Sequence, residues 1–205
     1  MTIKKIGILT GGGDAPGLNA VLRAAVKTAI NRYNLSVIGF LNGFGGLIKN
    51  EYRELSLAEV MGILPRGGTI LGTTNRDNPF HYPQKQANGK IDFIDLSDQV
   101  MTHIAQHQLD ALLVIGGDGS LSIASELQKK GIRVMGVPKT IDNDLRCTDQ
   151  TFGFDTALTT ATEALDKLHT TAESHHRVMI LEVMGRYAGW IALSAGIAGG
   201  ADVIL

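Results

Sequence analysis

The stretch that decides the fold is 111–144, ALLVIGGDGSLSIASELQKKGIRVMGVPKTIDND. An apolar run at 111–115 predicts a buried strand, the residue spacing of 121–130 predicts a helix, and a second apolar run at 132–137 predicts another strand. Strand, helix and strand within about 30 residues form a βαβ unit, whose strands run parallel. The loops at 116–120 and 138–144 therefore leave the same edge of the sheet.

The chemistry of these two loops points to a phosphorylated ligand. Open α/β sheets bind ligands at this edge, where helix N-termini and free backbone N–H groups gather. The glycines of 116–120 let the backbone approach an anion. Asp118, Asp142 and Asp144 would repel a phosphate unless a cation intervenes or one of them acts as a base. Phosphoryl transfer requires this combination of donors, a carboxylate for Mg²⁺ and a carboxylate that takes a proton.

Five motifs together resemble the 6-phosphofructokinase family. They are GGGDAPGLNAVLR at 11–23, GGDGS at 116–120, PKTIDND at 138–144, FGFDTA at 152–157 and EVMGR at 182–186. They keep the family's order and cover the chain from end to end. GGDG alone also occurs in NAD kinases and diacylglycerol kinases, so the joint match carries the resemblance. The chain is similar to the phosphofructokinase A type, with features of its pyrophosphate-using branch.

The resemblance implies an α/β fold with a Rossmann-like, doubly wound and mostly parallel sheet, followed by the start of a second α/β lobe. We expect a donor-binding lobe at 1–150 and the first part of a sugar-phosphate-binding lobe at 151–205. In the latter, the pattern predicts helices at 154–171 and 186–198 and strands at 176–183 and 202–205. The last predicted strand has no loop after it, so we expect the remainder of this lobe to be absent.

The residues before 111 predict further elements of the first lobe. Strands are expected at 3–10 and 35–40, helices at 17–32, 57–64 and 97–108, glycine-rich loops at 42–46 and 66–72, and an exposed excursion at 78–89. The loop at 11–16 raises the possibility of dinucleotide binding. Its third glycine position is Pro16, Asp14 lies inside it, and the next strand ends without an acid for a ribose, so this alternative is disfavoured.

Composition excludes several classes of partner. Lys plus Arg number 19 against 20 for Asp plus Glu, so no global field favours nucleic acid or an anionic membrane. The single cysteine, Cys147, excludes an internal disulfide framework. The apolar run at the start is too short for a signal peptide or a membrane span. We expect a cytoplasmic protein.

The resemblance implies roles on the acceptor side. Asp142 is expected to be the general base for the 1-hydroxyl of fructose 6-phosphate; from the residues alone, an Asp-Asn-Asp run is more often a turn. Arg177 matches a family arginine that reaches the substrate of a neighbouring subunit, which implies a homodimer or homotetramer. The further substrate-binding residues expected are Thr140, Ile141, Asp144, Met184, Gly185 and Arg186.

On the donor side, Asp118 is expected to hold Mg²⁺ and Arg76 to contact the transferred phosphoryl group. The donor phosphates are expected to contact Gly13, Gly117, Asp118, Gly119 and Ser120. In the family, a small residue at position 119 leaves room for the α-phosphate of ATP, whereas Lys139 is typical of the pyrophosphate branch. We expect Lys139 to be catalytic, ATP to be the donor with ADP as product, and pyrophosphate to be the alternative donor.

Three alternatives remain beside an ATP-dependent 6-phosphofructokinase. They are a pyrophosphate-dependent fructose 6-phosphate phosphotransferase, another GGDG kinase of the NAD or lipid kinase type, and a truncated, non-catalytic nucleotide-binding module. His103 and His107, spaced i and i+4, are expected to lie on a solvated face rather than to bind a metal. Tyr187, Trp190 and the stripe of Ile191, Leu193, Ala195 and Ile197 are expected to be core.

Overall fold

The computed structural model describes residues 3–86 and 89–205 and has an α/β fold built on one six-stranded sheet. The strand order is β3-β2-β1-β6-β7-β8. β1, β2, β6 and β7 run parallel, and β3 pairs antiparallel with β2. The strands are β1 Lys5–Thr10, β2 Ser36–Phe40, β3 Tyr52–Glu54, β6 Ala111–Gly116, β7 Val134–Thr140 and β8 Phe152–Gly153. The predicted mostly parallel sheet is confirmed.

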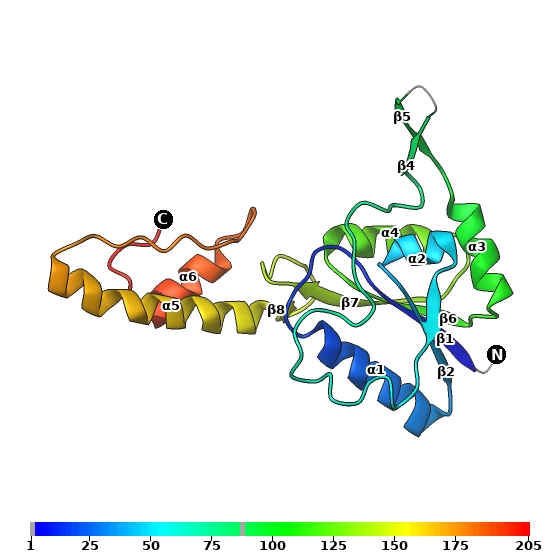
Figure 1. Cartoon of the computed structure of the whole chain (residues 1–205), viewed down its shortest axis with the longest axis horizontal. Helices are drawn as coiled ribbons and strands as arrows, with labels where there is room; N and C mark the ends of the chain where they lie inside the picture. Colours follow the sequence, from blue (N-terminus) through cyan, green and yellow to red (C-terminus); the bar gives the residue numbers. More distant parts are fainter. Residues whose placement is uncertain (1–2, 87–88) are drawn as a thin grey trace. The chain divides into compact units, whose positions relative to one another are not determined.

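Helices cover both faces of the sheet (Figure 1). α1 (Leu18–Tyr33) lies on one face, and α2 (Phe44–Lys49), α3 (Ser97–Gln106) and α4 (Asp118–Lys129) lie on the other. Successive strand residues point to opposite faces, so each strand supplies both cores. Ile8 packs with the α1 cluster, whereas Leu9 packs with the cluster under the other three helices. This double burial explains why the central strands read as continuous apolar runs.

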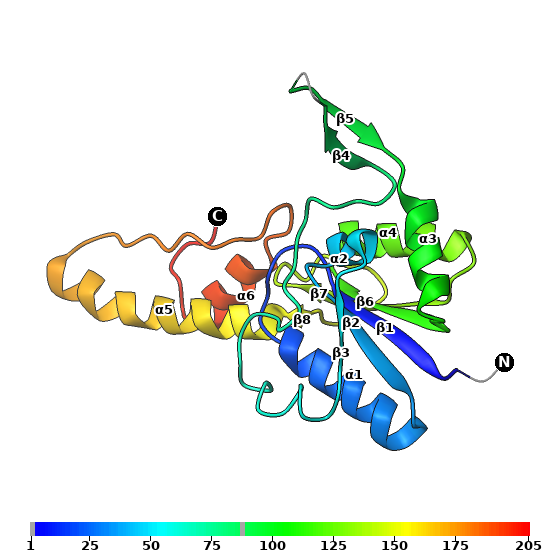
Figure 2. The same ribbon diagram turned by 45° about the vertical axis from the view of Figure 1, so that its right-hand side comes forward.

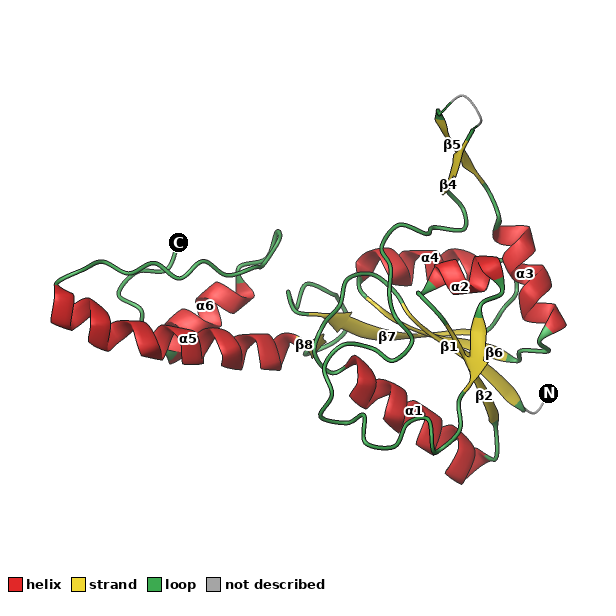
Figure 3. Cartoon of the chain, in the orientation of Figure 1, coloured by secondary structure: helices red, strands yellow, loops and turns green. Residues whose placement is uncertain are grey.

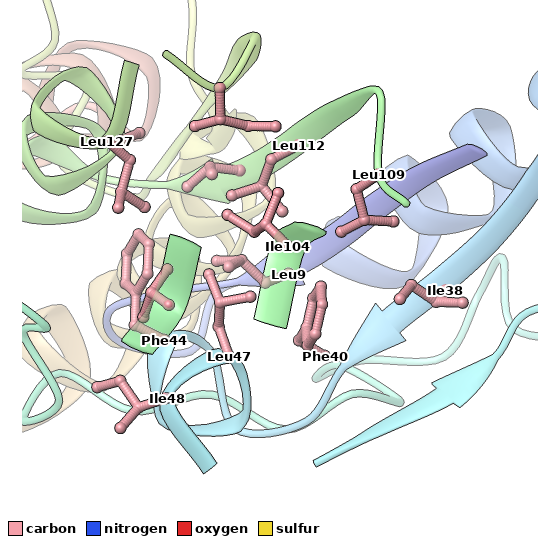
Figure 4. Close-up of a cluster of buried hydrophobic side chains, with 14 residues drawn as sticks. Leu9, Ile38, Phe40, Phe44, Leu47, Ile48, Ile104, Leu109, Leu112 and Leu127 are labelled. Carbon is pink, nitrogen blue, oxygen red and sulfur yellow. The ribbon is translucent and has the colours of Figure 1, made fainter. Parts of the chain in front are cut away.

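The larger core joins three helices to the sheet (Figure 4). Phe44 and Leu47 come from α2, Ile104 from α3 and Leu127 from α4, and they meet strand residues such as Phe40. α2 begins inside the stretch 42–46 that we predicted to be a loop. The tight packing of α2 leaves no room for a side chain at Gly46, because a Cβ there would overlap the backbone oxygen of Leu41. The glycines therefore permit a helix in close contact with the chain before it.

A two-stranded hairpin, β4 (Tyr82–Lys85) and β5 (Ile91–Ile94), projects away from the six-stranded sheet (Figures 1 and 2). We predicted an exposed excursion at 78–89, and its residues 87–88 lie outside the described ranges. The predicted helix at 57–64 is wrong, because these residues form turns. The hydroxyl of Ser56 does accept a bond from the N–H of Glu59, but the turn does not continue into a helix.

The chain folds as two compact units, Met1–Lys139 and Thr140–Leu205. In the second unit, α5 (Phe154–His175) packs against α6 (Trp190–Ala198) through Phe154, Ala161, Ile191 and Ala195. The assignment of 1–150 and 151–205 to donor and sugar-phosphate binding stays a prediction.

Several predictions in the second unit are wrong. The segments at 176–183 and 202–205 are not strands, and the chain between α5 and α6 is drawn as loop (Figure 3). A strand needs a hydrogen-bonded neighbour, and none of the described residues pairs with either segment. Tyr187 is 92% exposed and Trp190 49%, so neither belongs to the core. In the α6 stripe, Ile191 and Ala195 are buried as predicted, whereas Leu193 and Ile197 are exposed.

Candidate functional site

Two glycine segments meet at the carboxyl edge of the sheet: the loop after β1 and the turn between β6 and α4. The loop predicted at 116–120 is shorter than expected, because β6 ends at Gly116 and α4 begins at Asp118, which leaves only Gly117 between them. β1 and β6 are neighbours, with Thr10 opposite Ile115, and the N–H of Gly11 donates to the oxygen of Ile115 at 2.9 Å. Ser120, on the first turn of α4, packs against Gly11 in the loop after β1 and against Gly116 at the end of β6. A Cβ at Gly11 would lie 2.6 Å from its Oγ, and one at Gly116 would overlap its Cβ. Only glycine at these two positions permits this approach.

We therefore predict that Gly116→Ala lowers the free energy of unfolding by about 1–3 kcal/mol, because the new methyl group overlaps Ser120 and would lie 3.2 Å from the carbonyl oxygen of Gly11. Chemical denaturation measures this loss. Gly67→Ala is the matched control, because a methyl group added at Gly67 would meet open space. Adding Ser120→Gly to Gly116→Ala should restore part of the stability. Equal stability of both single variants would contradict the packing argument.

The first turn of α4 presents backbone donors beside a carboxylate. The helix begins at Asp118, after Gly117 in an extended conformation, and Asp118 and Gly119 are exposed. The N–H groups of a first helical turn have no partner within the helix and carry the positive end of its dipole. Ser120 is buried, so its predicted contact with donor phosphates stays a prediction that involves its backbone N–H rather than its hydroxyl.

Lys139 joins the end of β7 to the first glycine loop. Its side chain is 4% exposed, and its Nζ donates a hydrogen bond to the oxygen of Gly13, 126 residues earlier in the chain. A buried ammonium group requires such acceptors, because burial otherwise disfavours its charge. Gly13 itself is exposed, and a Cβ added there would have no atom of the described chain within 4 Å. The ammonium group of Lys139 thus contacts the backbone oxygen of Gly13, while the position of a Cβ on Gly13 is open.

Arg76 follows a segment that is hydrogen-bonded to the same loop. Gly12 donates its N–H to the oxygen of Thr74 at 3.0 Å and accepts from the hydroxyl of Thr73 at 2.6 Å. The N–H of Arg76 donates to the hydroxyl of Thr74, and the Arg76 side chain is exposed. The exposed Arg76 side chain lies two residues from this anchor, and its contact with the transferred phosphoryl group stays a prediction.

In the second unit, Thr140 and Asp142 form a local pair. The N–H of Asp142 donates to the hydroxyl of Thr140 at 3.1 Å, and that hydroxyl lies 3.5 Å from Oδ2 of Asp142. Oδ1 of Asp142 is buried and has no hydrogen-bond partner among the described residues. A buried carboxylate oxygen with no donor is costly, and it marks a functional candidate. Asp144 is exposed and Ile141 packs near the α5–α6 core.

Thr151 and Asn143 fix the backbone around Asp142. The hydroxyl of Thr151 donates to the oxygen of Thr140 at 2.7 Å, and its N–H donates to Oδ1 of Asn143 at 2.9 Å. Asn143 has a positive φ of 51°, a conformation that Asn tolerates better than most residues. The turn reading of Asp-Asn-Asp is therefore correct for Asn143. It does not account for the unpartnered oxygen of Asp142.

The other predicted substrate residues lie on the exposed segment of the second unit. Arg177 follows the end of α5, where its N–H donates to the oxygen of Ala172, so it does not begin a strand. Gly185 accepts from the N–H of Ala188 in a tight turn. Arg186 has a φ of 52°, and its guanidinium lies 5.3 Å from the ring of Tyr187. Met184 is 73% exposed. Their substrate contacts stay predictions.

The predicted residues thus fall into two groups, which belong to different units. The first unit holds Gly13, Arg76, Gly117, Asp118, Gly119, Ser120 and Lys139. The second holds Thr140, Ile141, Asp142, Asp144, Arg177, Met184, Gly185 and Arg186. Sequence reasoning missed Thr73 and Thr151, which hold the site by hydrogen bonds. The partner of Thr73 is the backbone oxygen of Gly12, 61 residues earlier, and Thr151 lies between the motifs at 138–144 and 152–157, so no motif singled out either residue.

The described residues contain no group of three or more His, Cys, Asp or Glu side chains that could hold a metal ion. Magnesium does not need one, because it commonly binds through one or two carboxylates, water and substrate phosphates. Asp118, exposed beside the free N–H groups of α4, fits that arrangement. Within residues 3–86 and 89–205, no helix is both long and apolar enough to cross a membrane.

His103 and His107 support packing between α2 and α3 and do not form a solvated face. Nδ1 of His103 bonds to the oxygen of Leu47, and Nε2 of His107 bonds to Oδ1 of Asn50. Burial lowers the pKa of His107, and the charges of Lys5 and His103 lower it further. Because the pKa of His107 is lower in the folded than in the unfolded chain, its protonation favours unfolding as the pH falls.

Comparison with known proteins supports the motif-based assignment. The phosphofructokinase family model matches residues 5–205. An ATP-dependent 6-phosphofructokinase 2 of Clostridium perfringens is 61% identical over 99% of this chain and 56% of its own length. A pyrophosphate–fructose 6-phosphate 1-phosphotransferase of Amycolatopsis mediterranei is 52% identical over 98% of this chain and 55% of its own length.

A solved structure shares the fold over nearly the whole chain. The phosphofructokinase of Pichia pastoris superposes with a TM-score of 0.84 and 36% identity, over 98% of this chain and 22% of that one. This chain spans little more than half the length of the two curated relatives. Since one family model covers almost every residue, this chain belongs to the phosphofructokinase family.

Proposed function

We propose that this chain contributes the donor site and the general base of an ATP-dependent 6-phosphofructokinase. The reaction transfers the γ-phosphoryl group of ATP to the 1-hydroxyl of fructose 6-phosphate and yields ADP and fructose 1,6-bisphosphate. The observation that carries the proposal is the meeting of two glycine segments, one after β1 and one between β6 and α4, beside the first turn of α4. Lys139 binds the first of them through the oxygen of Gly13.

On the donor side, backbone donors and cations bind the phosphates. The N–H groups of 117–120 and the loop at Gly13 contact the phosphates, and Arg76 contacts the transferred group. Asp118 holds Mg²⁺, which neutralises phosphate charge. Gly13 and Gly119 carry no side chain that could obstruct the donor. A Cβ added at either position would have no atom of the described chain within 4 Å, so space for the phosphates is open there.

On the acceptor side, Asp142 takes the proton of the attacking hydroxyl. Thr140 is placed to hold Oδ2, and the unpartnered Oδ1 is the oxygen that receives the proton. Thr140, Ile141 and Asp144 bind the sugar, and Met184, Gly185 and Arg186 bind its phosphate. Arg177 serves a neighbouring subunit, so the whole protein is proposed to be a cytoplasmic homodimer or homotetramer.

Gly119 favours ATP over pyrophosphate as the donor. A Cβ added there would have nothing of the described chain within 4 Å, although glycine costs about 0.5–1 kcal/mol within a helix. Packing within the chain therefore does not require glycine at position 119. Space for the α-phosphate of ATP would explain why this position has no side chain. Pyrophosphate remains the second candidate because Lys139 is typical of pyrophosphate-using members, and one such relative is 52% identical.

We predict that Gly119→Asp shifts donor use from ATP towards pyrophosphate. The new carboxylate would occupy the space for the α-phosphate of ATP and repel it, and kcat/KM for ATP should fall about 10- to 100-fold. Coupled assays of fructose 1,6-bisphosphate formation with each donor measure the change. Gly119→Ala is the matched control and should lose much less. Equal loss with both donors would contradict clearance as the role of Gly119.

The test of the function uses two proteins. One is this chain, and the other is a hybrid in which residues 1–205 are followed by the remaining C-terminal length of the Clostridium perfringens relative. Fructose 1,6-bisphosphate should form with ATP in the hybrid. Product from neither donor would refute the kinase. If the hybrid is active and the 205-residue chain is not, the 205-residue chain is a non-catalytic nucleotide-binding module. Unchanged turnover of ATP in the Asp142→Asn variant would favour another GGDG kinase.

A further inference from the structure

Asn19 is a buried polar side chain to which neither the motifs nor the proposed reaction assigns a role. It is the second residue of α1 and is 1% exposed. An Asn near a helix start often caps the helix, but no described side chain makes a capping hydrogen bond to α1, whose N-cap is Gly17. The Asn19 amide therefore serves another segment.

That segment is the glycine-rich loop at 66–72, which leads to Arg76. Nδ2 of Asn19 donates to the oxygens of Arg66 and Gly67 at 3.0 and 3.2 Å, and its Oδ1 accepts from the N–H of Ile70 at 2.8 Å. One side chain thus satisfies three backbone groups within five residues. Since every partner is a backbone atom, Asn19 holds the path of the loop whatever its side chains are.

Two further contacts fix the rest of the loop onto β1 and the first glycine loop. The buried hydroxyl of Thr10 donates to the oxygen of Gly72 at 2.8 Å and lies 3.0 Å from the hydroxyl of Thr69. After Gly72, the hydroxyl of Thr73 donates to the oxygen of Gly12, and the N–H of Gly12 donates to the oxygen of Thr74. The loop is therefore held at its start by Asn19, in its middle by Thr10 and at its end by Gly12.

We infer that Asn19 is a positioning residue for the donor site, which acts by fixing the loop that carries Arg76. This inference rests on the proposed function, in which Arg76 contacts the donor. An exposed arginine loses conformational entropy when it adopts the one geometry that binds a phosphate. A backbone that is already fixed makes this loss smaller. Without the Asn19 amide, the start of the loop loses three bonds, and the guanidinium samples positions away from the phosphate.

The test is a double-mutant cycle on the 205-residue chain, with the Kd of Mg²⁺·ATP as the readout. Asn19→Leu has similar volume and no hydrogen bonds, and it should raise Kd about tenfold, as should Arg76→Ala. The double variant should also lose about tenfold rather than a hundredfold, because an unfixed Arg76 contributes little. Asn31→Leu, an exposed change on the same helix, is the matched control and should leave Kd unchanged.

Hydrogen exchange supplies a second readout that separates loop fixation from general destabilisation. In Asn19→Leu, the amides of Ile70 and Gly12 should exchange faster, while amides shared by β1 and β6 keep their protection. If Asn19→Leu does not fold, Thr73→Val removes the bond at the other end of the loop and should show the same non-additivity with Arg76→Ala.

The outcomes distinguish this inference from the proposed function. Additive losses, or an effect of Arg76→Ala without one of Asn19→Leu, would overturn the positioning role and leave the donor site standing. No binding of Mg²⁺·ATP by the unaltered chain, or no effect of Arg76→Ala, would refute the proposed donor site and this inference with it. Non-additive losses with faster exchange at Ile70 would support both.

Discussion

Asp142→Asn should reduce kcat for phosphoryl transfer by about 10²- to 10⁴-fold, the usual contribution of a positioned general base. The amide keeps the shape of the side chain and cannot take a proton at Oδ1. Oδ1 is buried without a donor among the described residues, so its replacement breaks no hydrogen bond that would lower stability. The rate of fructose 1,6-bisphosphate formation by the hybrid, with saturating ATP and sugar phosphate, measures the effect.

Asp149→Asn provides the control for Asp142→Asn, because Asp149 is an exposed carboxylate of the same loop and has no assigned role. Its kcat should match that of the unaltered protein. The Kd of Mg²⁺·ATP should be unchanged in both variants, since the proposed base acts on the acceptor. A kcat for Asp142→Asn within twofold of the unaltered value would remove Asp142 from the reaction.

Lys139→Met should weaken the binding of both ATP and pyrophosphate about 10- to 100-fold, a range equivalent to the loss of one charged hydrogen bond. Methionine fills a similar volume but cannot donate to the oxygen of Gly13. The first glycine loop then loses the contact that holds it beside β7, and the proposed donor site loses a positive charge. Titration calorimetry on the 205-residue chain with each donor measures both constants.

Lys129→Met is the matched control for the lysine variant. Lys129 is an exposed residue of α4 paired with Glu126, and surface ion pairs contribute little. Its donor affinity should stay within twofold of the unaltered chain. If Lys139→Met bound pyrophosphate normally and lost only ATP, Lys139 would be a selectivity residue and its contact with the glycine loop would be incidental.

The local motifs predicted the first unit well. Apolar runs located the central parallel strands because residues such as Ile8 and Leu9 are buried on opposite faces of the sheet. The glycines located the loops at the carboxyl edge. Predictions failed where a segment depends on a distant neighbour: residues 176–183 have strand-like composition but no pairing partner among the described residues, and Tyr187 looks like a core residue yet is exposed.

By itself, the sequence determined the family, the parallel sheet and the glycine segments at its carboxyl edge, because these depend on periodicity and on glycines that are close together in the chain. Only the tertiary structure decided which side chains hold those loops. Lys139 meets Gly13 across 126 residues, and Asn19 meets Ile70 across 51. Both bind backbone atoms, which every residue possesses, so no side-chain pattern in the sequence could have indicated the contacts.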